Sequence, residues 1–155
     1  MRRRYFFIVL TIIWMAVIFA FSAQDGERSN RTSMAVGEAV GEVKHPDFNE
    51  WDMAERNAYI EDVNKPIRKT AHFLEYAILG VLCLGSLYKT HETTFCKAAI
   101  SLGICVIYSI TDELHQLISV GRACKVTDIL IDSSGALVGI VIGLALVYMV
   151  EAHAK

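Results

Sequence analysis

The sequence predicts an all-α membrane protein with four transmembrane helices in a single domain, residues 1–155. Hydrophobic residues make up 54% of the chain, which is more than ordinary soluble domains contain. The mean hydropathy is +0.38, and the apolar residues gather in long runs with few charges. Runs of about 20 apolar residues are long enough to cross the hydrocarbon core of a bilayer as helices.

The first two predicted spans cover residues 5–22 and 68–88. The first is uncharged and longer than the apolar core of a usual secretory signal, so we interpret it as a retained helix. Most of the second is also uncharged, and its ionisable residues, among them His72 and Glu75, lie in its first turns. This span would therefore carry its polar side chains at one end.

The third and fourth predicted spans cover residues 98–117 and 128–150. The uncharged part of the third ends at Thr111 and is too short to cross a bilayer, so the span needs residues 112–116 as well. Polar side chains at that depth are costly and usually functional. From its second residue onward, the fourth span is apolar except for Asp132.

The segment between the first two spans, residues 23–67, is predicted to be an outer loop. Residues 27–43 and 49–63 each place apolar side chains among polar ones and contain no proline. This pattern favours two short amphipathic helices lying on the membrane surface, with Pro66 ending the second. A partly ordered loop without membrane contact is the alternative.

Basic residues predict the orientation of the chain in the membrane. Arginines 2–4 precede the first span, and Lys89 and Lys97 flank the short connection between the second and third spans. Because an excess of Lys and Arg marks the cytoplasmic side, we expect both termini in the cytoplasm. The outer loop, in which acidic residues outnumber basic ones, then faces outward.

With this topology, the polar residues within and beside the spans all fall at the outer end of the bundle. Spacings of three or four residues place members of each helix on a shared face, as for His72 and Glu75. We therefore predict an outward-facing polar pocket. Its candidate residues are Arg68, His72, Glu75, Asp112, Glu113, His115, Gln116, Arg122, Asp128, Asp132 and, after the first span, Gln24.

One hypothesis is a membrane-embedded hydrolase or transferase that uses a metal ion. Carboxylates and imidazoles suit Zn²⁺ or Mn²⁺, and a carboxylate-rich site suits Mg²⁺. The ion would activate water or clamp a lipid-linked phosphate, which Arg68 and Arg122 would also contact. The candidate catalytic residues are His72, Glu75, Asp112, Glu113 and His115. The candidate metal ligands are His72, Glu75, Asp112, His115 and Asp132.

Another hypothesis is a binder without catalysis, which recognises a cell-wall precursor, a lipid head group or a lipoglycopeptide drug. Its ligand-binding residues would be Arg68, Gln116, Arg122, Asp128, Asp132 and Gln24. The same groups can also pair as Arg68–Glu75 or Arg122–Asp128. A purely structural network is an alternative, disfavoured because clustered carboxylates repel one another. Transport is disfavoured because the inner half of the spans lacks ionisable residues.

Gly135, Gly139 and Gly143 recur every fourth residue on the last span. Small residues at this spacing allow close helix approach, either within the bundle or in a homo-oligomer. The net charge of −2 gives no indication of a nucleic-acid partner. Cys83 and Cys105 lie within apolar runs, which is typical of packing residues.

Several motifs in this order resemble the VanZ-like family of bacterial membrane proteins. They are residues 21–24, 68–76, 112–116, 121–122 and 128–132, followed by Gly135 and Gly139. The resemblance implies a small integral membrane protein of the bacterial cell envelope. Action on, or binding near, cell-wall or lipid-linked material is our own hypothesis from the polar residues. The family's namesake is linked to lowered sensitivity to the glycopeptide teicoplanin. Asp132 departs from the family pattern, because many relatives carry Asn there.

Overall fold

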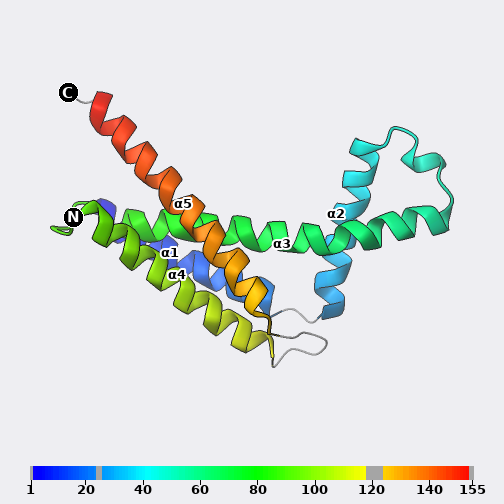
Figure 1. Cartoon of the computed structure of the whole chain (residues 1–155), viewed down its shortest axis with the longest axis horizontal. Coiled ribbons are helices and arrows are strands. Elements are labelled where there is room, and N and C mark those ends of the chain that lie inside the picture. The colour runs from blue at the N-terminus through cyan, green and yellow to red at the C-terminus, as the bar shows by residue number, and fades with distance from the viewer. Residues whose placement is uncertain (1, 24–25, 118–123, 154–155) are drawn as a thin grey trace.

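The computed structural model describes residues 2–23, 26–117 and 124–153, and these ranges contain helices and turns but no strand (Figure 1). This confirms the predicted all-α class. The elements in chain order are α1 (Arg2–Ser22), α2 (Gly26–Lys44), the 3-10 turn η1 (Phe48–Glu50), α3 (Met53–Ser86), α4 (Thr94–Gln116) and α5 (Val126–His153).

Within the described part of the chain, three helices are long and apolar enough to cross a membrane. They are residues 3–22 of α1, all of α4 and all of α5, and they coincide with three of the four predicted spans, one of which extends a single residue beyond α4. The remaining predicted span, residues 68–88, coincides with the C-terminal part of α3 and the turn after it. Polar residues such as Lys69, His72 and Glu75 make this part less apolar than the other three. The count of four spans therefore stays a prediction.

Helix α3 is the longest helix and corrects one prediction. It runs without interruption from Met53 to Ser86 with Pro66 inside it, so the expectation that Pro66 ends a separate surface helix is wrong. Proline removes one backbone hydrogen bond from a helix. Pro66 is exposed, so solvent can satisfy the carbonyl group that the proline leaves without a partner. With 34 residues, the helix is about 50 Å long and projects beyond the bundle (Figure 1).

Helices α3 and α5 are packed backbone against backbone. A Cβ atom added at Gly139 would lie 1.9 Å from the carbonyl oxygen of Ala77, and one at Gly135 would lie 2.2 Å from that of Phe73. From the opposite side, a Cβ at Gly80 would lie 2.4 Å from the carbonyl oxygen of Ala136. The glycine ladder of the last span therefore packs within the chain, and α3 occupies its face.

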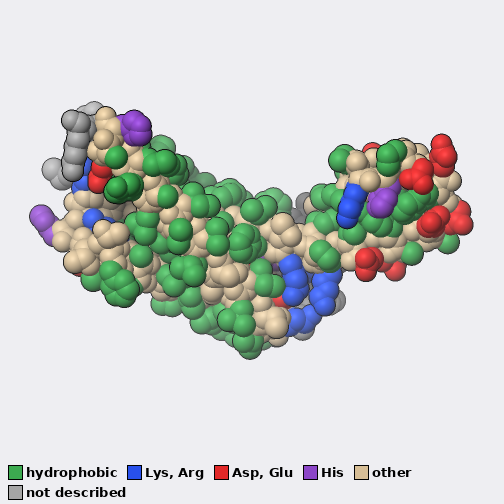
Figure 2. All heavy atoms as spheres, turned by 45° about the horizontal axis from the view of Figure 1, so that its top comes forward, with side chains coloured by type: hydrophobic (Ala, Val, Ile, Leu, Met, Phe, Trp, Pro, Cys, Tyr) green, Lys and Arg blue, Asp and Glu red, His purple; other side chains and the backbone are tan. Residues whose placement is uncertain are grey.

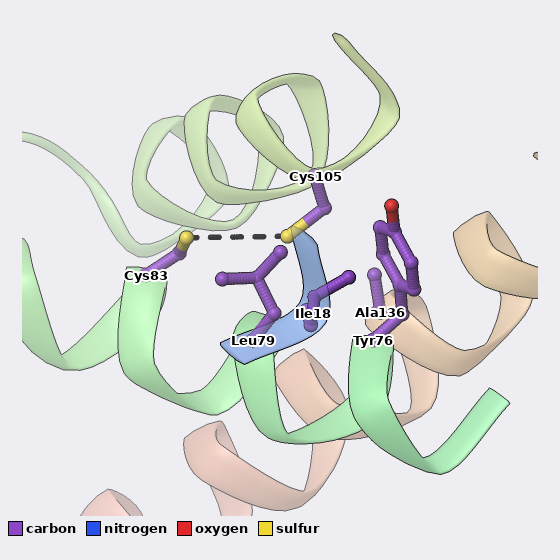
Figure 3. Packing of buried hydrophobic residues seen from close by; sticks show 6 residues of the cluster. All are labelled: Ile18, Tyr76, Leu79, Cys83, Cys105 and Ala136. Atoms are coloured by element: carbon purple, nitrogen blue, oxygen red, sulfur yellow. Dashed lines mark hydrogen bonds between the residues drawn. The ribbon is translucent and has the colours of Figure 1, made fainter. Parts of the chain in front are cut away.

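The buried core lies where α1, α3, α4 and α5 meet (Figure 3). Tyr76 and Leu79 of α3 are fully buried there beside Ile18 of α1. Cys83 and Cys105 are buried free thiols whose sulfur atoms lie 4.0 Å apart. Their position confirms the packing role that the sequence predicted for these cysteines.

A distal hairpin, consisting of α2, η1 and residues 53–67 of α3, extends from one end of the bundle (Figure 1). Phe48 is fully buried against the rings of Trp51 and Tyr59. Arg56 ties α3 to α2 through an ion pair with Glu38, with 2.7 Å between nitrogen and oxygen. Acidic side chains gather on this hairpin away from the bundle, whose visible surface is mostly hydrophobic (Figure 2).

Candidate functional site

Asp132 is the point at which polar residues of α3, α4 and α5 meet. Its side chain is 1% exposed, and its Oδ2 accepts a 2.7 Å hydrogen bond from the Ser109 hydroxyl of α4. The other oxygen, Oδ1, lies 3.9 Å from Nδ1 of His72 on α3. The same His72 nitrogen is 3.8 Å from Oε2 of Glu75. Because a buried charge is costly without partners, these contacts fix the mutual positions of the three helices.

Gln116 connects α4 to the end of α1. Its Nε2 donates a 2.9 Å hydrogen bond to the Ser22 hydroxyl and a longer one, 3.4 Å, to Oδ2 of Asp112. All three side chains are buried. These residues belong to two of the motifs that carried the family resemblance, so part of that pattern holds the helix ends together.

Glu113 binds the start of α5. Its Oε2 accepts a 2.9 Å hydrogen bond from the backbone N–H of Lys125. The carbonyl of Lys125 in turn accepts from the N–H groups of Asp128 and Ile129, so Lys125 is the N-cap residue, immediately before the first helical residue Val126. A negative charge is favourable at a helix N-terminus. Glu113, predicted as a catalytic residue, thus has a clear contact that positions α5.

Lys69 and Asp128 form a second link between α3 and α5, with 3.7 Å between Nζ and Oδ1. The predicted pair between Arg68 and Glu75 is absent from the described structure, where Glu75 faces His72 instead. Arg122 lies outside the described residues, so its predicted pairing with Asp128 is not addressed by the structure. Gln24 also lies outside them.

His115 lies elsewhere on α4. Its ring packs on that of Phe19 of α1, with 4.4 Å between centroids, while His72 faces α5. Among the described residues, no group of three or more His, Cys, Asp or Glu side chains is arranged to hold a metal ion. The predicted metal ligands are therefore not assembled into a metal centre. They were His72, Glu75, Asp112, His115 and Asp132.

A cleft of about 360 Å³ opens beside this network, between α3 and the adjoining ends of α4 and α5. We call it the basic cleft, because four cationic side chains and three carboxylates line it. The cations are Lys65, Arg68, Lys69 and Lys125, and the carboxylates are Glu61, Asp128 and Asp132. Lys and Arg side chains are visible together at this end of the bundle, next to the distal hairpin (Figure 2).

Arg68 is the distinctive residue of the basic cleft. Its side chain is half-buried, yet it makes no hydrogen bond or ion pair with any residue that the structure describes. Two of the three carboxylates of the cleft face other groups, since Asp128 faces Lys69 and Asp132 faces Ser109 and His72. The guanidinium is therefore available to a ligand.

Sequence reasoning missed part of this cleft. It assigned Glu61 and Lys65 to the outer loop because it ended a helix at Pro66, and it overlooked Lys69 and Lys125. A helix that continues through Pro66 places Glu61, Lys65 and Arg68 on one face, at spacings of four and three residues. That periodicity was the available signal.

One family of known proteins matches nearly the whole chain, including the residues of this site. The model of the VanZ/LLP1 family matches residues 7–148. The chain belongs to the VanZ/LLP1 family. Every residue of the α3–α4–α5 network lies inside the matched range, which confirms the resemblance seen in the sequence motifs. Neither a search of curated proteins nor a search of solved structures found a match.

Proposed function

We propose that this VanZ/LLP1 family protein binds the anionic head group of a lipid or cell-wall precursor in its basic cleft. Binding at the outer face of the bacterial cytoplasmic membrane would then lower sensitivity to teicoplanin-type glycopeptides. The observation that carries the proposal is Arg68, a half-buried cation that pairs with none of the residues in the described ranges and that shares its cleft with three lysines.

The membrane topology is part of the proposal. In this topology the C-terminal part of α3 forms the fourth span, which its glycine-mediated contact with the apolar helix α5 supports. Both termini face the cytoplasm, since Lys89 and Lys97 lie at the end of the bundle opposite the basic cleft. Helix α2 then lies at the outer surface of the membrane, with Val36, Val40 and Val43 exposed.

The cations of the basic cleft contribute to binding in different ways. Lys65 and Lys125 are exposed and attract an anion to the rim of the cleft. Arg68 lies deeper, and its planar guanidinium can bind two oxygens of a phosphate at once. Because Asp128 and Asp132 face other protein groups, they do not neutralise Arg68. A phosphate held there would be screened from a drug that acts on the same surface.

The test measures phosphate binding and drug tolerance together. Glycerol 3-phosphate is titrated into the purified full-length chain, and teicoplanin tolerance is measured in cells that express it. We expect Arg68→Gln to weaken binding about tenfold or more, because it removes charge-assisted hydrogen bonds, and to lower tolerance. Lys89→Gln, in the turn that follows the C-terminal end of α3, is the control and should change neither. Wild-type binding by Arg68→Gln would refute the proposal.

A further inference from the structure

A second cleft, of about 180 Å³, lies between α2, the end of α1 and α3. Its apolar walls include Phe21 of α1, Val36 of α2, and Ile67 and Ala71 of α3. We call it the side cleft. Phe21 is 53% exposed and lies at the end of an apolar helix that is long enough to span the membrane. The side cleft therefore opens at the level where the hydrocarbon chains of a bilayer begin.

The two clefts share Arg68 and His72. The basic cleft extends from these residues toward α5 and is rich in charged groups, whereas the side cleft extends toward α2 and is mostly apolar. An amphiphile fits this pair of surfaces better than a fully polar molecule does. Its anionic group would lie on the α5 side of Arg68, and its chain would pass to the α2 side.

The packing of α2 gives the side cleft its shape. A Cβ atom at Gly37 would lie 3.2 Å from Val63, so α2 touches α3 closely at this point. One turn earlier, the Ser33 hydroxyl donates a 2.5 Å hydrogen bond to Oδ1 of Asn64. These contacts fix α2 across α3 beside the end of α1 (Figure 1). Val36 of α2 and Ala71 of α3 thereby both line the side cleft.

We propose that the site binds a lipid phosphate, with the phosphate on Arg68 in the basic cleft and a hydrocarbon chain in the side cleft. Because the basic cleft supplies the head-group site, this proposal rests on the proposed function. The ligand would therefore be an anionic lipid and not a water-soluble fragment of a wall precursor. Membrane phospholipids and lipid-linked wall precursors share this chemistry.

The experiment compares binding of a ligand that has a hydrocarbon chain with binding of the head group alone. Dihexanoyl phosphatidic acid and glycerol 3-phosphate are titrated into the full-length chain at one detergent concentration, so that partition into micelles is the same for every variant. Ala71→Trp and Val36→Trp fill the side cleft from its two walls. Ala58→Trp, an exposed position on α3 that lines neither cleft, is the matched control.

We expect Ala71→Trp and Val36→Trp to weaken binding of the phosphatidic acid about tenfold, which corresponds to about two methylene groups no longer buried. Both should bind glycerol 3-phosphate as well as Ala58→Trp does, which also shows that they are folded. If instead both bind the phosphatidic acid like the control, while Arg68→Gln still loses glycerol 3-phosphate, the lipid-chain proposal fails and the head-group proposal stands.

If Arg68→Gln leaves both ligands bound, the two proposals fail together. Geranyl phosphate, titrated in parallel, distinguishes the sources of the lipid. Tighter binding of this isoprenoid would point to a lipid-linked wall precursor, and tighter binding of the phosphatidic acid would point to a membrane phospholipid. Loss of either preferred lipid in Ala71→Trp supports the proposal.

Discussion

Helices α3 and α5 meet in two different ways along a single contact. Away from the basic cleft, Gly139 and Gly135 allow the backbone of α5 to touch that of α3. Beside the basic cleft, the same face of α5 presents Asp132 and Asp128, whose carboxylates lie 3.9 Å from His72 and 3.7 Å from Lys69 of α3. Where α5 carries glycines, the two helices touch. Where it carries aspartates, they stand farther apart and leave room for the basic cleft.

The glycine contact between α3 and α5 should tolerate substitution less well than the region around the basic cleft. Gly139→Leu should abolish the folded protein, because even a Cβ would lie 1.9 Å from a backbone oxygen of α3. The measurement is the yield of monodisperse, protease-resistant protein after extraction from membranes. Gly103→Leu in α4 is the control, since nothing lies within 4 Å of a Cβ added there. Equal yields of the two variants would contradict the packing that we describe.

Around the basic cleft, the buried carboxylate should matter more for stability than the partly exposed one. Asp132→Ala removes the buried acceptor of the Ser109 hydroxyl and the carboxylate that faces His72, and it should lower the free energy of unfolding by about 2 kcal/mol. Asp128→Ala breaks a partly exposed pair with Lys69 and should cost less than about 1 kcal/mol. Denaturation in detergent compares the two variants directly. A larger loss for Asp128→Ala would show that Asp132 does not join the helices.

The smallest effect that we expect is a difference in ligand binding between variants of the two candidate histidines. His72 lines the basic cleft, so His72→Ala should weaken binding of glycerol 3-phosphate about threefold, a loss of roughly 0.7 kcal/mol. His115 packs on Phe19 instead, and His115→Ala should leave binding unchanged. Titrations of both variants provide the measurement. Equal losses would place His115 in the binding site after all.

Much of the bundle was predictable because few backbone structures can span a bilayer. Long apolar runs indicated the helices α1, α4 and α5, and the spacing of Gly135 and Gly139 indicated a close helix contact. The shared level of His72 and Asp132 followed from the predicted topology, in which the second and fourth spans begin on the same side of the membrane. These inferences depend on the composition and the period of the sequence, which need no knowledge of packing.

Other features depend on packing and could not be read from the sequence. Whether Pro66 ends a helix depends on whether solvent reaches the carbonyl that it leaves unpaired. Neighbouring helix positions differ by about 100°, so the rotation of α4 decides that Gln116 lines the basic cleft and reaches Ser22, while His115 packs on Phe19. The partner of Glu113 is a backbone N–H, which no residue pattern reveals.

The central claim is that α3 and α5 converge around a cleft that opens to the outside of the cell. Lys69→Cys and Asp128→Cys, combined in a chain whose native cysteines are replaced by alanine, test it most directly. A short, membrane-impermeant bifunctional thiol reagent is applied to intact cells. We predict an intramolecular cross-link between α3 and α5. Absence of that link, or its formation only after the cells are permeabilised, would contradict the claim.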